Sequence, residues 1–265
     1  MASEKTATSQ ELLFKGVEKL AANTNVPSIM KISKEAFPLV YSKKKEVIAA
    51  GTHFGKGRMI AVSHRQYISK EFEEKTGWPR FSRNVYKWLA PDICRPKIGI
   101  LKVKDQEYYK KHYDNMTTFG FIVSHVSSLT ELDKMDAFLA DTSTKYDKDV
   151  LDKITDLVQN KGKGVFIIGH NNGNVNPSGN DILLDCGMKI TSNRAASGES
   201  LQLAKPGTGI TPAGDGGSGG DGGSGGAGGS GGAGGSGGAG GAGGAGGSGG
   251  EGGSGGAGGS GAGGN

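Results

Sequence analysis

The segment AFLADTSTKYDKDVLDKITDLVQNKGKGVFIIGH, residues 137–170, decides the fold of this chain. Its first apolar run, Ala137–Ala140, and its last, Val165–Gly169, contain no polar residue, which is typical of strands buried on both faces. The intervening Asp147–Asn160 predicts a helix, because its apolar residues recur at helical spacing. They are Val150, Leu151, Ile154, Leu157 and Val158. A strand, a helix and a second strand in this order indicate a parallel pair joined by a crossover helix.

The same alternation extends to both sides of this unit. The sequence predicts two more strands upstream with a helical stretch between them, and a short helix and an edge strand downstream. These elements are Ile98–Val103, residues 105–116, Phe119–Ser124, Asp181–Cys186 and Lys189–Thr191. Residues 97–192 are therefore expected to form an α/β core, with a mainly parallel sheet flanked by helices.

A different pattern precedes this core. Ser9 is a suitable N-cap for a helix running to Ala22. Residues 36–64 contain three short apolar runs separated by turn-forming residues, which predicts a β-hairpin segment. The runs are Ala36–Tyr41, Glu46–Gly51 and Arg58–Ser63, and Lys43–Lys45 lie in the first turn. An amphipathic helix with Trp88 on its apolar face then ends before Pro91.

Glycine is concentrated at the end of the chain. Of 50 glycines among 265 residues, 34 lie in residues 213–265, where the rest are almost all Ala or Ser. The absence of proline and of a strict three-residue period excludes collagen. No side chain larger than alanine is available there for a core, apart from three acids and the final Asn. We therefore expect residues 1–212 to form one α/β domain and residues 213–265 to be a disordered tail.

The charge and the cysteines narrow the function classes. Residues 1–212 hold all 31 Lys and Arg and 23 acids, a formal charge of +8. This positive charge permits weak contact with anionic lipid. The sequence has no run of five basic residues, so binding to nucleic acid is not expected. Cys94 and Cys186 are isolated, so no zinc pattern is present, and no cofactor motif occurs. The polar start and the lack of a long apolar run predict a cytoplasmic protein.

The stretch from Ala36 to Leu101 resembles the N-terminal region of the TRP channel-associated factor family. The resemblance consists of strand and turn motifs and continues weakly into KITDLVQNKGKGVFIIGHNN. The motifs are Phe37-Pro38, Ala49-Ala50-Gly51, Gly55-x-Gly57-Arg58, Ser63-His64, Trp88-Leu89 and Ile98-Gly99-Ile100. It implies a class I glutamine-amidotransferase-like fold. It also implies binding to a cation channel, with effects on the channel's gating and surface delivery.

Two departures from that family bear on activity. Relatives carry an enhancin-like metallopeptidase domain, whereas only the glycine-rich segment follows the α/β region here. No HExxH motif occurs, since His64 is followed by Arg65 and Gln66, so the zinc site of that motif cannot form. Neither cysteine lies on a tight strand-to-helix turn of the kind an amidotransferase nucleophile needs. We therefore expect a non-enzyme.

One group of residues is a candidate site. Ligands of open α/β sheets bind beyond the carboxyl ends of the strands, and Lys104, His125, Asp141 and His170 are predicted there. The two histidines are candidate bases or ligands. The simpler interpretation, which we favour, is that polar residues begin wherever strands end. His53 with Lys56 and Arg58 forms a smaller basic group, interpreted as a solvated hairpin tip.

The leading functional hypothesis is a non-catalytic interaction module that binds a membrane channel from the cytoplasm, peripheral to the plasma membrane. One alternative is an amidotransferase- or hydrolase-like enzyme that uses the strand-end residues. The other is a structural or matrix protein based on the glycine-rich segment.

Overall fold

The computed structural model describes residues 2–22, 27–68, 76–101, 107–169, 177–195 and 201–206. The helices in these ranges are α1 (Ala2–Leu13), α2 (Trp78–Leu89), α3 (Lys110–Thr118), α4 (Leu129–Leu132), α5 (Lys148–Gln159) and α6 (Pro177–Leu184). The strands are β1 (Ser28–Ile32), β2 (Ala36–Tyr41), β3 (Val47–Phe54), β4 (Gly57–Val62), β5 (Lys97–Ile100), β6 (Ile122–His125), β7 (Ala137–Asp141), β8 (Gly164–Ile168), β9 (Met188–Arg194) and β10 (Gln202–Leu203).

One mixed sheet of eight strands organises the described residues, in the order β10-β2-β3-β4-β8-β7-β5-β6. The five strands from β4 to β6 are parallel to one another, whereas β10, β2, β3 and β4 pair antiparallel. The predicted α/β class with a mostly parallel sheet is confirmed. The hairpin strands extend the parallel sheet through the β4–β8 pair, in which Ile60 lies opposite Phe166.

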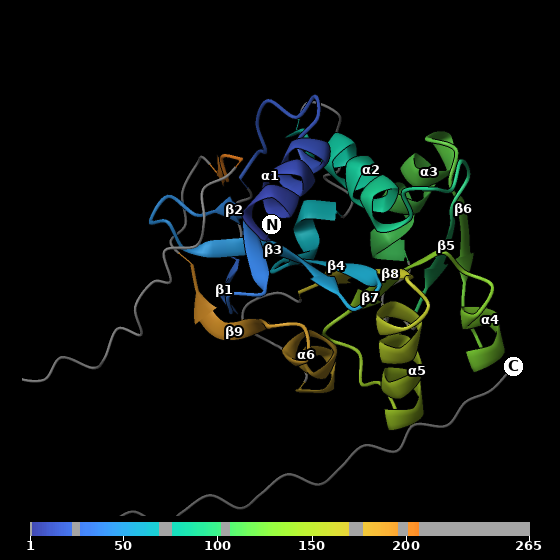
Figure 1. Ribbon diagram of the computed structural model, residues 1–265. Helices are drawn as coiled ribbons and strands as arrows, with labels where there is room; N and C mark the ends of the chain where they lie inside the picture. The colour runs from blue at the N-terminus through green and yellow to red at the C-terminus, as the bar shows by residue number, and fades with distance from the viewer. Residues whose placement is uncertain are drawn as a thin grey trace, which may run out of the picture. The chain divides into compact units, whose positions relative to one another are not determined.

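Helices cover both faces of this sheet (Figure 1). Helices α1, α2 and α3 lie on one face, and α5 and α6 lie on the other. Alternate residues of the central strands therefore enter two cores: Ile60 and Phe166 face α2, while Met59 and Val165 face α5. This arrangement explains why the central strands are apolar throughout.

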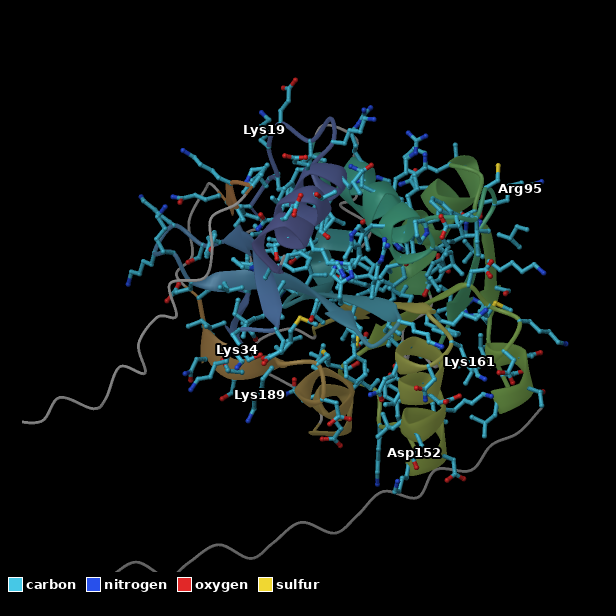
Figure 2. The ribbon with its side chains drawn as sticks, viewed as in Figure 1. Lys19, Lys34, Arg95, Asp152, Lys161 and Lys189 are labelled. Carbon is cyan, nitrogen blue, oxygen red and sulfur yellow. The ribbon has the colours of Figure 1, made fainter. Side chains whose placement is uncertain are left out.

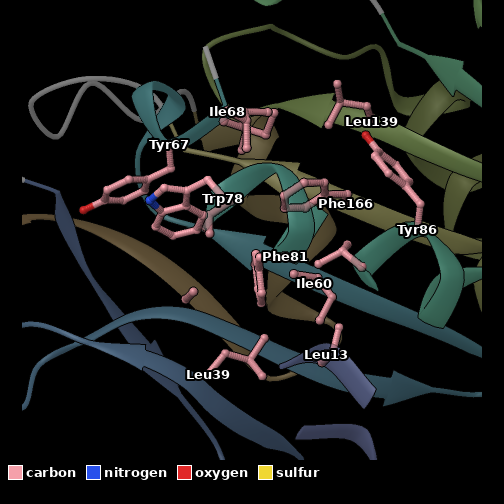
Figure 3. Close-up of a cluster of buried hydrophobic side chains, with 14 of the residues drawn as sticks. Leu13, Leu39, Ile60, Tyr67, Ile68, Trp78, Phe81, Tyr86, Leu139 and Phe166 are labelled. Carbon is pink, nitrogen blue, oxygen red and sulfur yellow. The ribbon is translucent and has the colours of Figure 1, made fainter. Parts of the chain in front are cut away.

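The core on the α2 side is rich in aromatic rings (Figure 3). Tyr86 of α2 packs edge-on against Phe166 of β8, with ring centroids 5.8 Å apart. Trp78 stacks on Tyr67 at 4.3 Å and meets Phe81 edge-on. Such pairs contribute about 0.5–1.5 kcal/mol each beyond the area they bury. Trp78 and Trp88 are both only 3% exposed, as predicted for core residues.

The predicted first helix is wrong in its position. The sequence predicts a helix from Ser9 to Ala22, whereas α1 ends at Leu13. Gly16 adopts a φ of +69°, a left-handed conformation that ends helices and that glycine enters without steric cost. Val17 and Leu20 are buried as their spacing suggests, but they lie on chain that is not helical.

The predicted edge strand also has a different partner. Strand β9 pairs antiparallel with β1 in a separate two-stranded sheet rather than with the main sheet. Lys31 and Lys189 face each other directly across that pair, and both are exposed. Figure 2 labels Lys34 and Lys189 in the part of the molecule that contains β1 and β9. Strands β1 and β10 and helix α4 were not predicted.

The predicted hairpin turns are present in the structure. The β3–β4 turn contains Gly55 at a φ of +59°, as expected for a hairpin, and the β2–β3 turn contains Lys45 at +67°. The glycine-rich segment 213–265, and with it the predicted boundary after residue 212, lies outside the described residues. Within the described ranges, no helix has the length and apolar character needed to cross a membrane.

Candidate functional site

The carboxyl ends of the five parallel strands meet at one edge of the sheet. The chain passes from β5 to β6 over the face that carries α3, and from β7 to β8 over the face that carries α5. Neighbouring β5 and β7 therefore send their connections to opposite faces, which creates the kind of crevice where open α/β sheets bind ligands. The structure thus confirms that His125 and Asp141 end strands at this edge.

Asp141, the last residue of β7, is only 2% exposed and is held on both carboxylate oxygens. The Tyr109 hydroxyl donates to Oδ2 at 2.8 Å, and the Ser143 backbone N–H donates to Oδ1 at 2.7 Å. The Tyr146 hydroxyl accepts from the Asp141 backbone N–H at 3.0 Å. Hydrogen bonds to a charged group are each worth about 1.5–3 kcal/mol, so this carboxylate ties α3 and the β7–α5 loop to the strand end.

The tyrosines around Asp141 are strongly biased toward the protonated form. Burial raises the pKa of Tyr109 well above its usual value, and the Asp141 carboxylate raises it further. Burial followed by the charge of Asp141 likewise raises the pKa of Tyr113. An anionic phenolate would be disfavoured both by desolvation and by the neighbouring carboxylate. Both tyrosines are therefore kept protonated rather than acting as bases, and Tyr109 donates its hydrogen bond to Asp141.

His125 lies on the same face of the sheet as Asp141, but the two residues are offset along the strand direction. His125 is in register with Ile100 and Leu139, whereas Asp141 is two residues further along β7. Two strand spacings and two residues of rise put the two backbones about 12 Å apart. The rings of Tyr109 and Tyr113 bridge this gap, with Tyr113 packed edge-on against His125 at 5.6 Å. The structure thus links the two residues through aromatic rings.

A pocket of about 250 Å³ opens at the same edge but on the opposite face of the sheet. Apolar side chains from the strand-end loops and from helices α4 and α5 form most of its wall, and serines and charged residues form the rest. The lining comprises Leu101, Val126, Ser127, Ser128, Leu129, Leu132, Lys145, Tyr146, Asp147 and Val150. Its volume lies just below the range usual for small-molecule sites. A local sequence pattern marks the start of α4: Ser128 is followed three residues later by Glu131, as in a capping box. In the structure, Glu131 Oε2 accepts a hydrogen bond from the Ser127 N–H at 2.7 Å.

Two members of the predicted cluster, Lys104 and His170, lie outside the described residues. The expectation that His125 and His170 lie together at this edge thus remains a prediction. His64, which follows β4, is fully buried, and its Nδ1 accepts from the Gln66 N–H at 3.2 Å. His64 therefore shapes the turn after β4.

The two cysteines differ in environment. Cys186 is 3% exposed and its thiol donates to the Leu183 carbonyl oxygen, with Sγ and O 3.0 Å apart. Burial raises the pKa of the Cys186 thiol to about 12, so the nucleophilic thiolate is scarce at neutral pH. Cys94 is exposed in the connection between α2 and β5. Their placement agrees with the sequence-based interpretation of ordinary thiols.

With this geometry in view, the comparison with known proteins identifies the family. The family model TCAF_N, described as the TRPM8 N-terminal domain, matches residues 1–205. The chain belongs to the TCAF_N family. Within it, TRPM8 channel-associated factor 2 of Homo sapiens is 36% identical over 76 residues, which is 28% of this chain and 8% of that protein. The Danio rerio homologue is 28% identical over 94 residues, or 35% of this chain and 9% of that protein.

Solved structures share the fold of this TCAF_N domain. The IMPa metallopeptidase from Pseudomonas aeruginosa superposes with a TM-score of 0.56 at 14% identity, over 75% of this chain and 24% of that one. The same enzyme in complex with T-antigen gives a TM-score of 0.55 at 13% identity. At this identity the likeness concerns the fold alone. The matches span only a small part of each relative or neighbour.

Proposed function

We propose that this TCAF_N domain is a protein-interaction module that binds a TRPM8-type cation channel at the cytoplasmic side of the membrane. The observation that carries the proposal is the family match over residues 1–205. Its relatives are named as TRPM8 channel-associated factors. Binding would modulate the channel or its delivery to the plasma membrane.

Two features of the described residues support a non-enzymatic role. The buried Cys186 thiol is held protonated, which disfavours it as a nucleophile. Asp141 at the strand ends is enclosed and uses both oxygens to hold Tyr109 and Ser143. We also propose a class I glutamine-amidotransferase-like fold, on the strength of the parallel strand order and the helices on both faces.

The test is a direct binding measurement with purified components. The full chain is immobilised, and detergent-solubilised TRPM8 is passed over it. The intact IMPa metallopeptidase, which shares the fold at 14% identity, is immobilised as the control for adhesion by the fold itself. We expect saturable retention of the channel by this chain and none by IMPa. Equal retention by both proteins, or by neither, would overturn the proposal.

A further inference from the structure

A second pocket, of about 560 Å³, lies away from the strand-end residues, on the face covered by α1. Strands β3 and β4 supply its floor at their turn, α1 supplies one wall, and Trp88 at the end of α2 supplies another. The lining residues are Glu4, Lys5, Thr8, Ser9, Leu12, His53, Arg58 and Trp88. Since β4 begins here, the pocket lies at the edge of the sheet opposite the carboxyl ends of the parallel strands.

Three cation-forming side chains converge on this pocket from three elements. His53 of β3 and Arg58 of β4 are directly opposed cross-strand partners, and Lys5 comes from α1. Burial, and after it the charges of Arg58 and Lys5, lowers the pKa of His53. The ring therefore lies in a region of positive potential.

Arg58 and His53 are held in place before any ligand arrives. Arg58 Nη1 donates to the Trp88 carbonyl oxygen at 2.7 Å, and its guanidinium lies 5.2 Å from the Trp88 ring centre. This bond uses one of the five N–H donors of the guanidinium. The His53 ring is positioned by Ser9 Oγ, 3.2 Å from its Nε2, and by Trp88 edge-on at 5.3 Å. Preorganised donors lower the entropic cost of binding.

Two acidic groups near the pocket match its two permanent cations, so the site offers converging hydrogen-bond donors rather than a net charge. Glu4 lines the wall formed by α1, and Asp92, just beyond α2, acts on Arg58 and raises its pKa against the lowering caused by burial. The remaining wall is apolar: it is formed by Trp88 and by Leu12, which is 51% exposed although it is a large apolar side chain. The pocket thus pairs converging donors with an aromatic and aliphatic surface.

We propose that this pocket binds a phosphate monoester. The phosphate would meet Lys5, His53 and Arg58, and the organic group of the ester would lie against Leu12 and Trp88. A phosphate presents several acceptor oxygens in different directions, which suits donors arriving from three elements, whereas a carboxylate is satisfied by a single bidentate arginine. The proposal does not depend on channel association.

The test is a titration of the full chain with phenyl phosphate, followed by calorimetry and by shifts of backbone amide NMR signals. Benzoate, which has the same ring and a carboxylate in place of the phosphate, is the matched ligand control. Lys5→Glu should weaken phenyl phosphate binding about tenfold, because it reverses a charge at the site. Lys19→Glu makes the same charge change at a distant surface position and should alter affinity less than about twofold (Figure 2).

Arg58→Gln should abolish binding. It also removes the bond to Trp88, so the melting temperature of this variant must be compared with that of the parent. Because Lys5 is exposed, Lys5→Glu should fold like the parent, and this variant still tests the proposal if Arg58→Gln unfolds. Sedimentation with phosphatidylcholine vesicles that contain phosphatidic acid tests a lipid source: loss of sedimentation in Lys5→Glu supports a lipid phosphate at this site. Absence of binding to phenyl phosphate at millimolar concentration and to these vesicles would overturn the proposal. So would equal affinity for benzoate, or an unchanged affinity in Lys5→Glu.

Discussion

Acidification should destabilise this domain through one buried histidine. His112 of α3 is fully buried, and its Nε2 lies 3.1 Å from the Tyr86 hydroxyl oxygen. Burial lowers the pKa of His112 from 6.5 to about 3 in the folded state. The unfolded chain therefore binds a proton below pH 6.5 that the folded domain excludes. Stability falls as pH falls through 6.5, at up to about 1.4 kcal/mol per pH unit, which gives a loss of about 2 kcal/mol between pH 7.5 and pH 5.0.

The measurement is urea unfolding at pH 7.5, 6.0 and 5.0, compared between the parent and His112→Gln. The difference between their unfolding free energies should change by about 2 kcal/mol over this range. Comparing the two proteins removes the contribution of His53, whose pKa is also lowered. The pKa values of Glu35 and Glu131 are lowered from 4.5, so the stability that these carboxylates contribute is lost only at more acidic pH.

Tyr86→Phe is the matched control for the hydrogen bond alone. It removes the hydroxyl that contacts His112 but leaves the imidazole buried, so stability should fall by a similar amount at every pH. A parent protein whose stability does not change between pH 7.5 and 5.0 would refute the reasoning. The same holds if His112→Gln shows the parent's full pH dependence.

Two further predictions concern backbone space and surface charge. Gly57→Ala should cost about 3 kcal/mol or more in urea unfolding, since its Cβ would lie 2.2 Å from the Lys163 carbonyl oxygen. Gly120→Ala should cost only about 1 kcal/mol, because its φ is +91° but no described atom lies within 4 Å, and equal losses would contradict the steric argument. Lys189→Glu should raise stability by about 0.5 kcal/mol, by replacing repulsion from Lys31 with attraction. The gain should shrink in high salt, and a salt-independent or negative change would count against it.

The sequence predicts best where the signal is local. Helix α5 was recognised from the recurrence of its apolar residues, and the hairpin strands from apolar runs separated by glycine and lysine turns. Both signals arise within a few residues of chain, so no distant partner is needed to interpret them. The helix expected up to Ala22 failed for a local reason as well, because Gly16 in the left-handed conformation ends the turn that follows Leu13.

Prediction failed where a partner lies far away in the chain. Strand β1 is short and contains polar residues, and it exists by pairing with β9, which lies more than 150 residues later. Buried Asn180 illustrates the same point: its amide donates to and accepts from the backbone of Ile190, fastening α6 to β9. In the sequence, Asn180 directly precedes the predicted helix Asp181–Cys186, and nothing nearby points to Ile190. A residue's non-local partner cannot be read from its own neighbourhood.

The same contrast separates the two polar regions of the sheet. At the carboxyl edge, Asp141 and Tyr109 satisfy each other, so this member of the group that the sequence suggested as a site holds elements together. At the opposite edge, Lys5 is brought to His53 and Arg58 by a helix some fifty residues earlier in the chain, and donors from three elements converge on one pocket. The sequence interpreted His53 and Arg58 as a solvated hairpin tip because it could not place α1 over them. The convergence of donors from three elements beside the exposed Leu12 favours ligand recognition at this edge.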